Sequence, residues 1–262
     1  MIRTLLINKY LVEQLIKNDI EQRYKGSILG ILWSIMVPII MLCVYTFVFG
    51  EVFQAKWEID TGNKYQFALV LFCGLSTFNM VSEVMSRSTT LIASNVNYVK
   101  KVIFPLELLP FIITISALFN CGISFMILLI AELLLTHTIS CTIYQIFFVF
   151  IPLIVISIGI GLIISALSVY LKDIANIISV LVTILMYMSP VFFPLSGIPE
   201  KFRFICLVNP MTYLIENFRN VTLYGENLNL SYYLISLVCA LVIYKLGYVL
   251  FKRAQIGFAD IL

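Results

Sequence analysis

The chain has 262 residues, and 12% of them are charged, about half the ~25% of an ordinary soluble domain. Hydrophobic residues make up 61%, and the mean hydropathy is +1.03. A soluble protein of this size could not bury so much apolar side chain, so the excess must face lipid. This composition excludes a disordered chain, a secreted disulfide scaffold and a soluble enzyme domain. The net charge of +3 is too small to indicate nucleic acid as a partner.

The first segment has no uninterrupted apolar core, so we do not expect a signal peptide. Residues 8–25 are instead predicted to form an amphipathic helix, because Val12, Ile16, Ile20 and Tyr24 recur every four residues on one face. Such a helix lies along the cytoplasmic surface of a membrane. A helix that is simply solvated is the alternative interpretation.

Several segments without charged residues reach the ~20 residues that a helix needs to cross a bilayer. The polar stretch 136–142 divides the longest of them into two. We therefore predict an all-α integral membrane protein with six transmembrane helices, at about residues 30–50, 65–84, 108–135, 143–170, 174–195 and 231–251. The whole chain, 1–262, is expected to be one transmembrane domain. Its parts are an interfacial helix and entry loop (1–28), spans one to five (29–195), an outer gate hairpin (196–230) and span six with a cytoplasmic tail (231–262).

The distribution of Lys and Arg predicts the orientation of these spans. With six spans, 12 of the 17 Lys and Arg residues fall on the side of the two termini. Cytoplasmic loops carry the excess of positive charge. Both termini are therefore predicted to be cytoplasmic, in a multi-pass protein of the cytoplasmic (inner) membrane.

The stretch 189–230 is too polar for a span and too apolar for an ordinary loop. It contains four prolines, at positions 190, 194, 199 and 210, which break helices. We interpret it as a re-entrant or interfacial hairpin on the outer side, in which Asn209–Pro210 marks a turn followed by a helix start. A loop that rests on the membrane is the alternative.

The chemistry of most enzymes and carriers is missing from the sequence. No Lys is followed by Ser or Thr, so there is no nucleotide-binding P-loop, and no ligand spacing indicates a metal site. His137 lies in a short outer loop and is interpreted as incidental, while a disulfide between Cys141 and Cys206 is possible. Charged side chains within the membrane region stand at span ends, where they can reach water, namely Glu83, Glu107, Glu132 and Lys245. A transport path without its own coupling chemistry must take its energy from a partner.

Aromatic side chains are concentrated in the first span and around the end of the fifth. We predict that they line a substrate path and stack on sugar rings: Trp33, Tyr45, Phe49, Tyr187, Phe192 and Phe193. Interfacial anchoring or core packing is the alternative for each of them. The small residues Ser157, Gly161 and Ser165 recur every four residues in the fourth span and allow close helix packing, either within the subunit or across a dimer.

Four short motifs follow one another along the chain. They are RYKGSILGILW at 23–33, NYVKKVIFPLELLP at 97–110, YLKDI at 170–174 and NP at 209–210. In this order and spacing the chain resembles the membrane subunit of type-2 ABC exporters of polysaccharides, a family that includes the permeases for O-antigen, teichoic acid and capsule. The resemblance covers essentially the whole chain. One departure is Leu106, where the family often has a basic residue.

The resemblance implies a homodimer that docks on two copies of a separate ATPase, which would bind ATP and Mg; no cofactor is expected in this chain. The substrate would be a polysaccharide, such as O-antigen, linked to a polyprenyl diphosphate. Entry of the lipid headgroup is assigned to Arg23, Tyr24 and Lys25. Coupling to the ATPase is assigned to segments 86–104 and 170–174, with the residues Asn97, Tyr98, Lys100, Lys101, Lys172 and Asp173.

Two other functions remain open at this point. The first is an ABC exporter of drugs or small lipids with a similar fold. The second is a membrane glycan or acyl transferase, which would require a catalytic cluster that the sequence does not contain.

Overall fold

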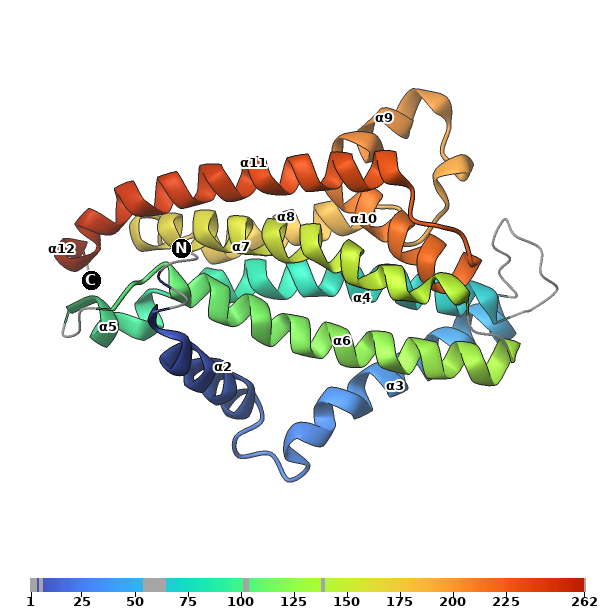
Figure 1. Ribbon diagram of the computed structural model, residues 1–262, viewed down its shortest axis with the longest axis horizontal. Helices are drawn as coiled ribbons and strands as arrows, with labels where there is room; N and C mark the ends of the chain where they lie inside the picture. Colours follow the sequence, from blue (N-terminus) through green and yellow to red (C-terminus); the bar gives the residue numbers. More distant parts are fainter. Residues whose placement is uncertain (1–3, 5–6, 54–64, 101–103, 138–139, 262) are drawn as a thin grey trace.

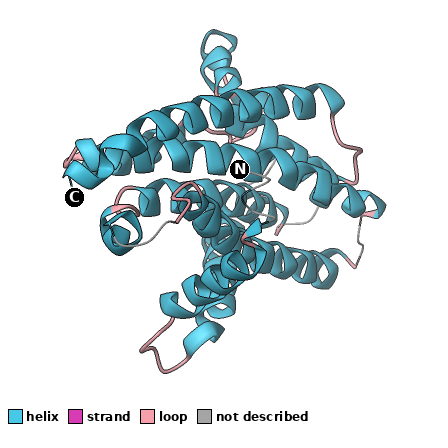
Figure 2. Ribbon diagram, turned by 60° about the vertical axis from the view of Figure 1, so that its left-hand side comes forward, coloured by secondary structure: helices cyan, strands magenta, loops and turns pink. Residues whose placement is uncertain are grey.

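The computed structural model describes residues 4, 7–53, 65–100, 104–137 and 140–261. Within these ranges every regular element is a helix (Figures 1 and 2). In chain order the elements are α2 (Lys9–Arg23), η1 (Gly30–Leu32), α3 (Trp33–Tyr45), η2 (Thr46–Val52), α4 (Gln66–Ser88), η3 (Ala93–Asn95), α5 (Val96–Lys100), α6 (Leu108–Thr136), η4 (Cys141–Gln145), α7 (Ile146–Tyr170), α8 (Ile174–Tyr187), η5 (Leu195–Gly197), α9 (Glu200–Val208), α10 (Pro210–Arg219), η6 (Asn220–Tyr224), α11 (Leu230–Ala254), η7 (Gln255–Gly257) and α12 (Phe258–Ile261).

Five helical segments in the described ranges are long and apolar enough to cross a membrane. They are Gly30–Val52, Gln66–Ser88, Leu108–Thr136, Cys141–Tyr170 and Leu230–Ile261. All five coincide with predicted spans. The predicted fifth span, 174–195, is occupied by the 14-residue helix α8, which ends at Tyr187 and is about 21 Å long at ~1.5 Å per residue. The chain then turns at Ser189 and Pro190, because proline cannot continue the hydrogen bonding of a helix.

Helix α4 lies at the centre of the bundle and is covered by α6, α7, α8 and α10 (Figure 1). It is the most buried of the long helices. The small-residue face of α7 packs against it inside the subunit. A Cβ atom added at Gly161 would lie 3.2 Å from Val84 and 3.3 Å from the hydroxyl of Ser88. The face Ser157–Gly161–Ser165 therefore serves packing within one subunit, the first of the two possibilities that the spacing allows.

A second close helix contact joins α7 to α11. A Cβ atom added at Gly159 would lie 2.6 Å from the backbone nitrogen of Tyr244, and one added at Gly247 would overlap the carbonyl oxygen of Gly159. The two backbones can approach this closely only because both positions lack side chains.

One end of the bundle is built around α10, which is buried along almost its whole length. As the sequence predicts, a helix starts at Asn209–Pro210. The side chain of Asn209 caps it by accepting a hydrogen bond from the backbone nitrogen of Met211 (3.0 Å), and Pro210 occupies the first turn. Helix α9 projects from the bundle (Figure 1). Cys141 and Cys206 are both free thiols in the structure.

Helix α2 packs across α6 near the opposite end of the molecule. Val12 is buried, and Leu15 and Ile16 pack against the core. The outward face carries the ion pairs Lys9–Glu13 and Lys17–Glu21, whose side chains are largely exposed. The helix thus packs on the protein partly through these apolar side chains, while the two ion pairs stay exposed.

Candidate functional site

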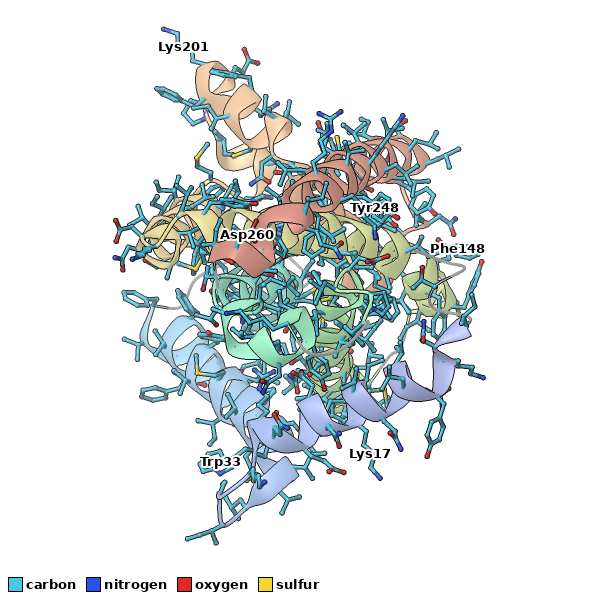
Figure 3. All side chains as sticks on the ribbon, turned by 90° about the vertical axis from the view of Figure 1, so that its left-hand side faces the viewer. Lys17, Trp33, Phe148, Lys201, Tyr248 and Asp260 are labelled. Atoms are coloured by element: carbon cyan, nitrogen blue, oxygen red, sulfur yellow. The ribbon has the colours of Figure 1, made fainter. Side chains whose placement is uncertain are left out.

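A cavity of about 290 Å³ opens between the end of α2, helix α3, α4 and α6. Four of the residues assigned from sequence line it together: Arg23, Tyr24, Trp33 and Tyr45. They come from both predicted groups, the headgroup entry and the aromatic path. Trp33, at the start of α3, is 39% exposed (Figure 3). The aromatic rings offer flat apolar faces beside the charge of Arg23.

The cavity also contains polar groups that the sequence analysis did not single out. Asn79 is the only exposed residue between Ala68 and Val81 of α4, and it faces this space. Asn120 of α6 accepts a hydrogen bond from the hydroxyl of Tyr24 (3.1 Å). Uncharged amides in the middle of apolar spans were the signal that could have revealed them, since such groups rarely face lipid.

Arg23 is held by Glu83 of α4. Its two terminal nitrogens donate to the two carboxylate oxygens, at 2.5 and 3.0 Å. Partial burial alone would lower the pKa of Arg23, but the hydrogen bond and the charge of Glu83 outweigh it and raise the pKa above its usual value. The guanidinium is therefore charged at the rim of the cavity. Lys25 is exposed and does not line the cavity.

The pair belongs to a row of four alternating charges. Arg87 donates to Asp19 (2.5 Å) and also lies 3.4 Å from Glu83. Asp19 and Arg23 are one turn apart on α2, and Glu83 and Arg87 are one turn apart on α4. The formal charges of the row sum to zero, and the row joins α2 to the central helix α4.

The other aromatic residues assigned to the path lie elsewhere. The ring of Phe49 stacks on Phe67, with centroids 5.1 Å apart, and packs against the core. Tyr187 stacks on Phe192 at 5.8 Å, and Phe193 is half-buried. Within one subunit these four residues do not line the cavity that holds Trp33 and Tyr45.

The elements assigned to coupling gather at one end of the bundle (Figure 1). The hydroxyl of Tyr170 donates to the carbonyl oxygen of Ala254 (2.7 Å), and the buried ring of Phe258 packs near it. Helix α12 also contacts α5. The end of α7, α12 and α5 therefore form one continuous surface.

Most of the assigned coupling residues are exposed on this surface, namely Asn97, Lys100, Lys172 and Asp173. Tyr98 instead turns inward, with its ring 4.9 Å from that of Phe104. Lys101 lies outside the described residues. Asp173 occupies the N-cap of α8, but its side chain makes no capping hydrogen bond, so it can act on the helix end only through its charge.

Taken together, these features define a helical integral membrane protein with an internal polar–aromatic cavity and a charged end surface. A family model described as "ABC-2 type transporter" matches residues 10–223. The chain belongs to this family, and it is therefore a transport subunit rather than an enzyme.

Individual relatives align along most of the chain. An O-antigen export system permease protein, RfbA, from Klebsiella pneumoniae is 25% identical over 93% of this chain and 92% of its own length. RfbA from Myxococcus xanthus is 27% identical over 84% and 83% of the two chains. The polysialic acid transport protein KpsM from Escherichia coli is 25% identical over 91% and 94%.

Proposed function

We propose that this chain is the permease subunit of an ATP-driven exporter that moves a lipid-linked polysaccharide across the cytoplasmic membrane. The substrate in this proposal is an O-antigen glycan on a polyprenyl diphosphate. The observation that carries it is the cavity in which a charged guanidinium stands beside Trp33, Tyr45 and two amides. Sugars and their anionic linkage need these groups, and the relatives named above are O-antigen and polysialic acid transporters.

The proposal includes a homodimer with the path between the subunits. Helices α3 and α8 lie on the same side of the molecule (Figure 3), and both carry exposed apolar side chains, among them Val37, Ile40, Val180 and Ile184. Pairing of two copies along these helices would cover this surface. It would also bring Tyr187 of each copy close to the aromatic residues of the first span.

In the same proposal α8, with the turn that follows it, is the fifth of six membrane crossings, and residues 196–230 form the re-entrant outer gate. The burial of α10 along almost its whole length supports a hairpin that dips into the bundle rather than a loop that rests on it. Both termini and the surface formed by α5, α12 and the 170–174 turn would then face the cytoplasm. Two copies of a separate ATPase, carrying ATP and Mg, would dock there.

The test is deletion of the gene followed by staining of the cell surface for polysaccharide. The expected result is loss of surface glycan, accumulation of lipid-linked chains inside the cell, and restoration of the surface by the intact gene. An unchanged surface in a strain without a second exporter would contradict the proposal and would favour an exporter of drugs or small lipids.

A further inference from the structure

A second cavity, of about 410 Å³, lies on the other side of the charged row from the first. It is bounded by α2, the end of α4, the η3–α5 segment and the start of α6. Its volume falls in the range of about 300–1,000 Å³ that is usual for small-ligand sites. No residue assigned to the substrate path from the sequence lines it, although Tyr98 of the coupling segment does.

The lining of this cavity is rich in neutral hydrogen-bonding groups. It contains three carboxamides, two hydroxyls and one phenol, from Asn18, Gln22, Asn95, Thr90, Ser94 and Tyr98. Carboxamides offer both donors and acceptors in one plane, and hydroxyls can do either. Such a set matches a ligand whose surface consists of neighbouring hydroxyl groups.

The charges at this cavity do not favour a free anion. Arg87 lines it but is already bound by Asp19 and Glu83. Asp19, the other charged lining residue, offsets the charge of Arg87 within the cavity. A neutral polyhydroxylated ligand fits this environment better than a phosphate, which would need an unpaired cation.

The two cavities share a single wall. Arg23 lines the aromatic cavity, Asp19 and Arg87 line the polar one, and Glu83 connects them by ion pairs. A ligand that reaches from one cavity into the other must pass along this row. It would present an apolar or aromatic-stacking part on one side of the row and hydroxyl groups on the other side, with the linkage between these two parts beside the row.

From this arrangement we infer that the polar cavity between α2, α4 and α5 is a saccharide subsite, which binds the sugar next to the diphosphate of the lipid-linked substrate. The inference rests on the proposed function and deepens it. Asn18 and Gln22, four residues apart on α2, bind the hydroxyl groups of this sugar. Recognition of the glycan therefore begins at the surface helix, beside the segment assigned to ATPase coupling.

The test compares two lipids on the complete permease–ATPase complex in lipid nanodiscs. One probe is a polyprenyl diphosphate carrying a single neutral hexose, and the other is the same polyprenyl diphosphate without sugar. The variant is the double substitution Asn18→Ala and Gln22→Ala. Both side chains are exposed, so the helix should fold normally. The control is Gln14→Ala, a carboxamide on the same helix outside the cavity.

The expected result is that the double variant binds the glycosylated lipid about tenfold more weakly and the sugar-free lipid unchanged, because two hydrogen bonds to the sugar are lost. The control should bind both as the unmodified protein does. Equal weakening for both lipids, or no weakening for either, would overturn the saccharide subsite. If the unmodified complex binds neither lipid, the proposed function itself fails.

Discussion

Arg219 is completely buried where α10 meets α4. Its guanidinium is bound to the carboxylate of Glu216 (2.8 Å), the carbonyl of Val191 (3.0 Å) and, at 3.4 Å, the carbonyl of Val70. It thereby ties together three parts of the chain that are far apart in sequence. A buried charge is tolerated only when hydrogen bonds replace water in this way.

Substitution Arg219→Ala should therefore destabilise the protein by roughly 3–5 kcal/mol, because it removes the buried ion pair with Glu216 and the hydrogen bonds to Val191 and Val70. Thermal unfolding in detergent measures this as a large drop in Tm. Arg219→Lys should recover only part of the loss, because an ammonium group cannot bond in three directions in one plane. The exposed Arg253 provides the control, and an equal effect of Arg253→Ala would show that the burial of Arg219 is not the cause.

The ion pair between Arg23 and Glu83 can be tested by a double-mutant cycle. We expect Arg23→Gln and Glu83→Gln to be non-additive by about 1 kcal/mol, a modest value because the pair is partly exposed. The measurement is again unfolding in detergent. The same cycle on the exposed pair Lys17–Glu21 should give a coupling close to zero. Full additivity for Arg23 and Glu83 would mean that α2 is not held by this contact.

Sequence reasoning identified Arg23, Trp33 and Tyr45 but not the partners that surround them. The residue types of the cavity could be predicted because charged and aromatic side chains stand out in an apolar chain. Their partners could not, since Glu83 is 60 residues from Arg23 and the contact depends on how α2 packs against α4. For the same reason the burial of Arg219 could not be predicted from its place in the stretch 189–230.

At the scale of elements, close packing of α7 and α11 depends on the absence of side chains at Gly159 and Gly247. Gly247→Ala places a methyl group against the carbonyl of Gly159, and the backbone cannot easily retreat. We expect a loss of about 1–3 kcal/mol, measured as a lower Tm. Gly122→Ala, in α6, is the matched control, because nothing lies within 4 Å of its added Cβ. A loss of equal size for Gly122→Ala would mean that the substitution itself destabilises a helix, and that the close contact between α7 and α11 is not the cause.

In the proposed function, coupling to the ATPase runs through short elements at the end of the bundle that holds α5 and α12. Reversing charge with Lys100→Glu and Lys101→Glu should reduce co-purification of the ATPase several-fold, while the amount of inserted permease stays the same. The readout is affinity purification of the ATPase with a tagged permease. Lys201→Glu on the projecting helix α9 is the control (Figure 3). Unchanged complex formation by the Lys100–Lys101 variant would remove α5 from the docking surface.

Long apolar windows predicted five of the helices well, because the thickness of the bilayer sets their length. The same rule could not delimit α8. The residues that follow it, up to Leu195, are apolar, but prolines at 190 and 194 stop the helix, and local turn geometry rather than hydropathy decides the boundary. The structure also assigned the small residues of α7 to internal packing, which spacing alone left open.

For the whole molecule, the exposed apolar surface of α3 and α8 leads to the prediction that two copies pair through it. The control surface is α6, whose exposed apolar residues would face lipid in either case. Tryptophan is a suitable probe because its bulk disturbs a close helix contact, while an apolar ring is accepted where the side chain faces lipid. Val180 of α8 and Ile130 of α6 are similarly exposed, at 59% and 55%.

Val180→Trp should shift the purified permease from dimer toward monomer and slow glycan export, because the larger side chain does not fit between closely packed helices. Ile130→Trp should leave the mass of the particle unchanged. Mass photometry at nanomolar concentration, or light scattering in detergent, measures the difference directly. If both variants remain dimeric and export normally, the subunits do not meet through α8, and the aromatic residues of α3 and α8 cannot share one path.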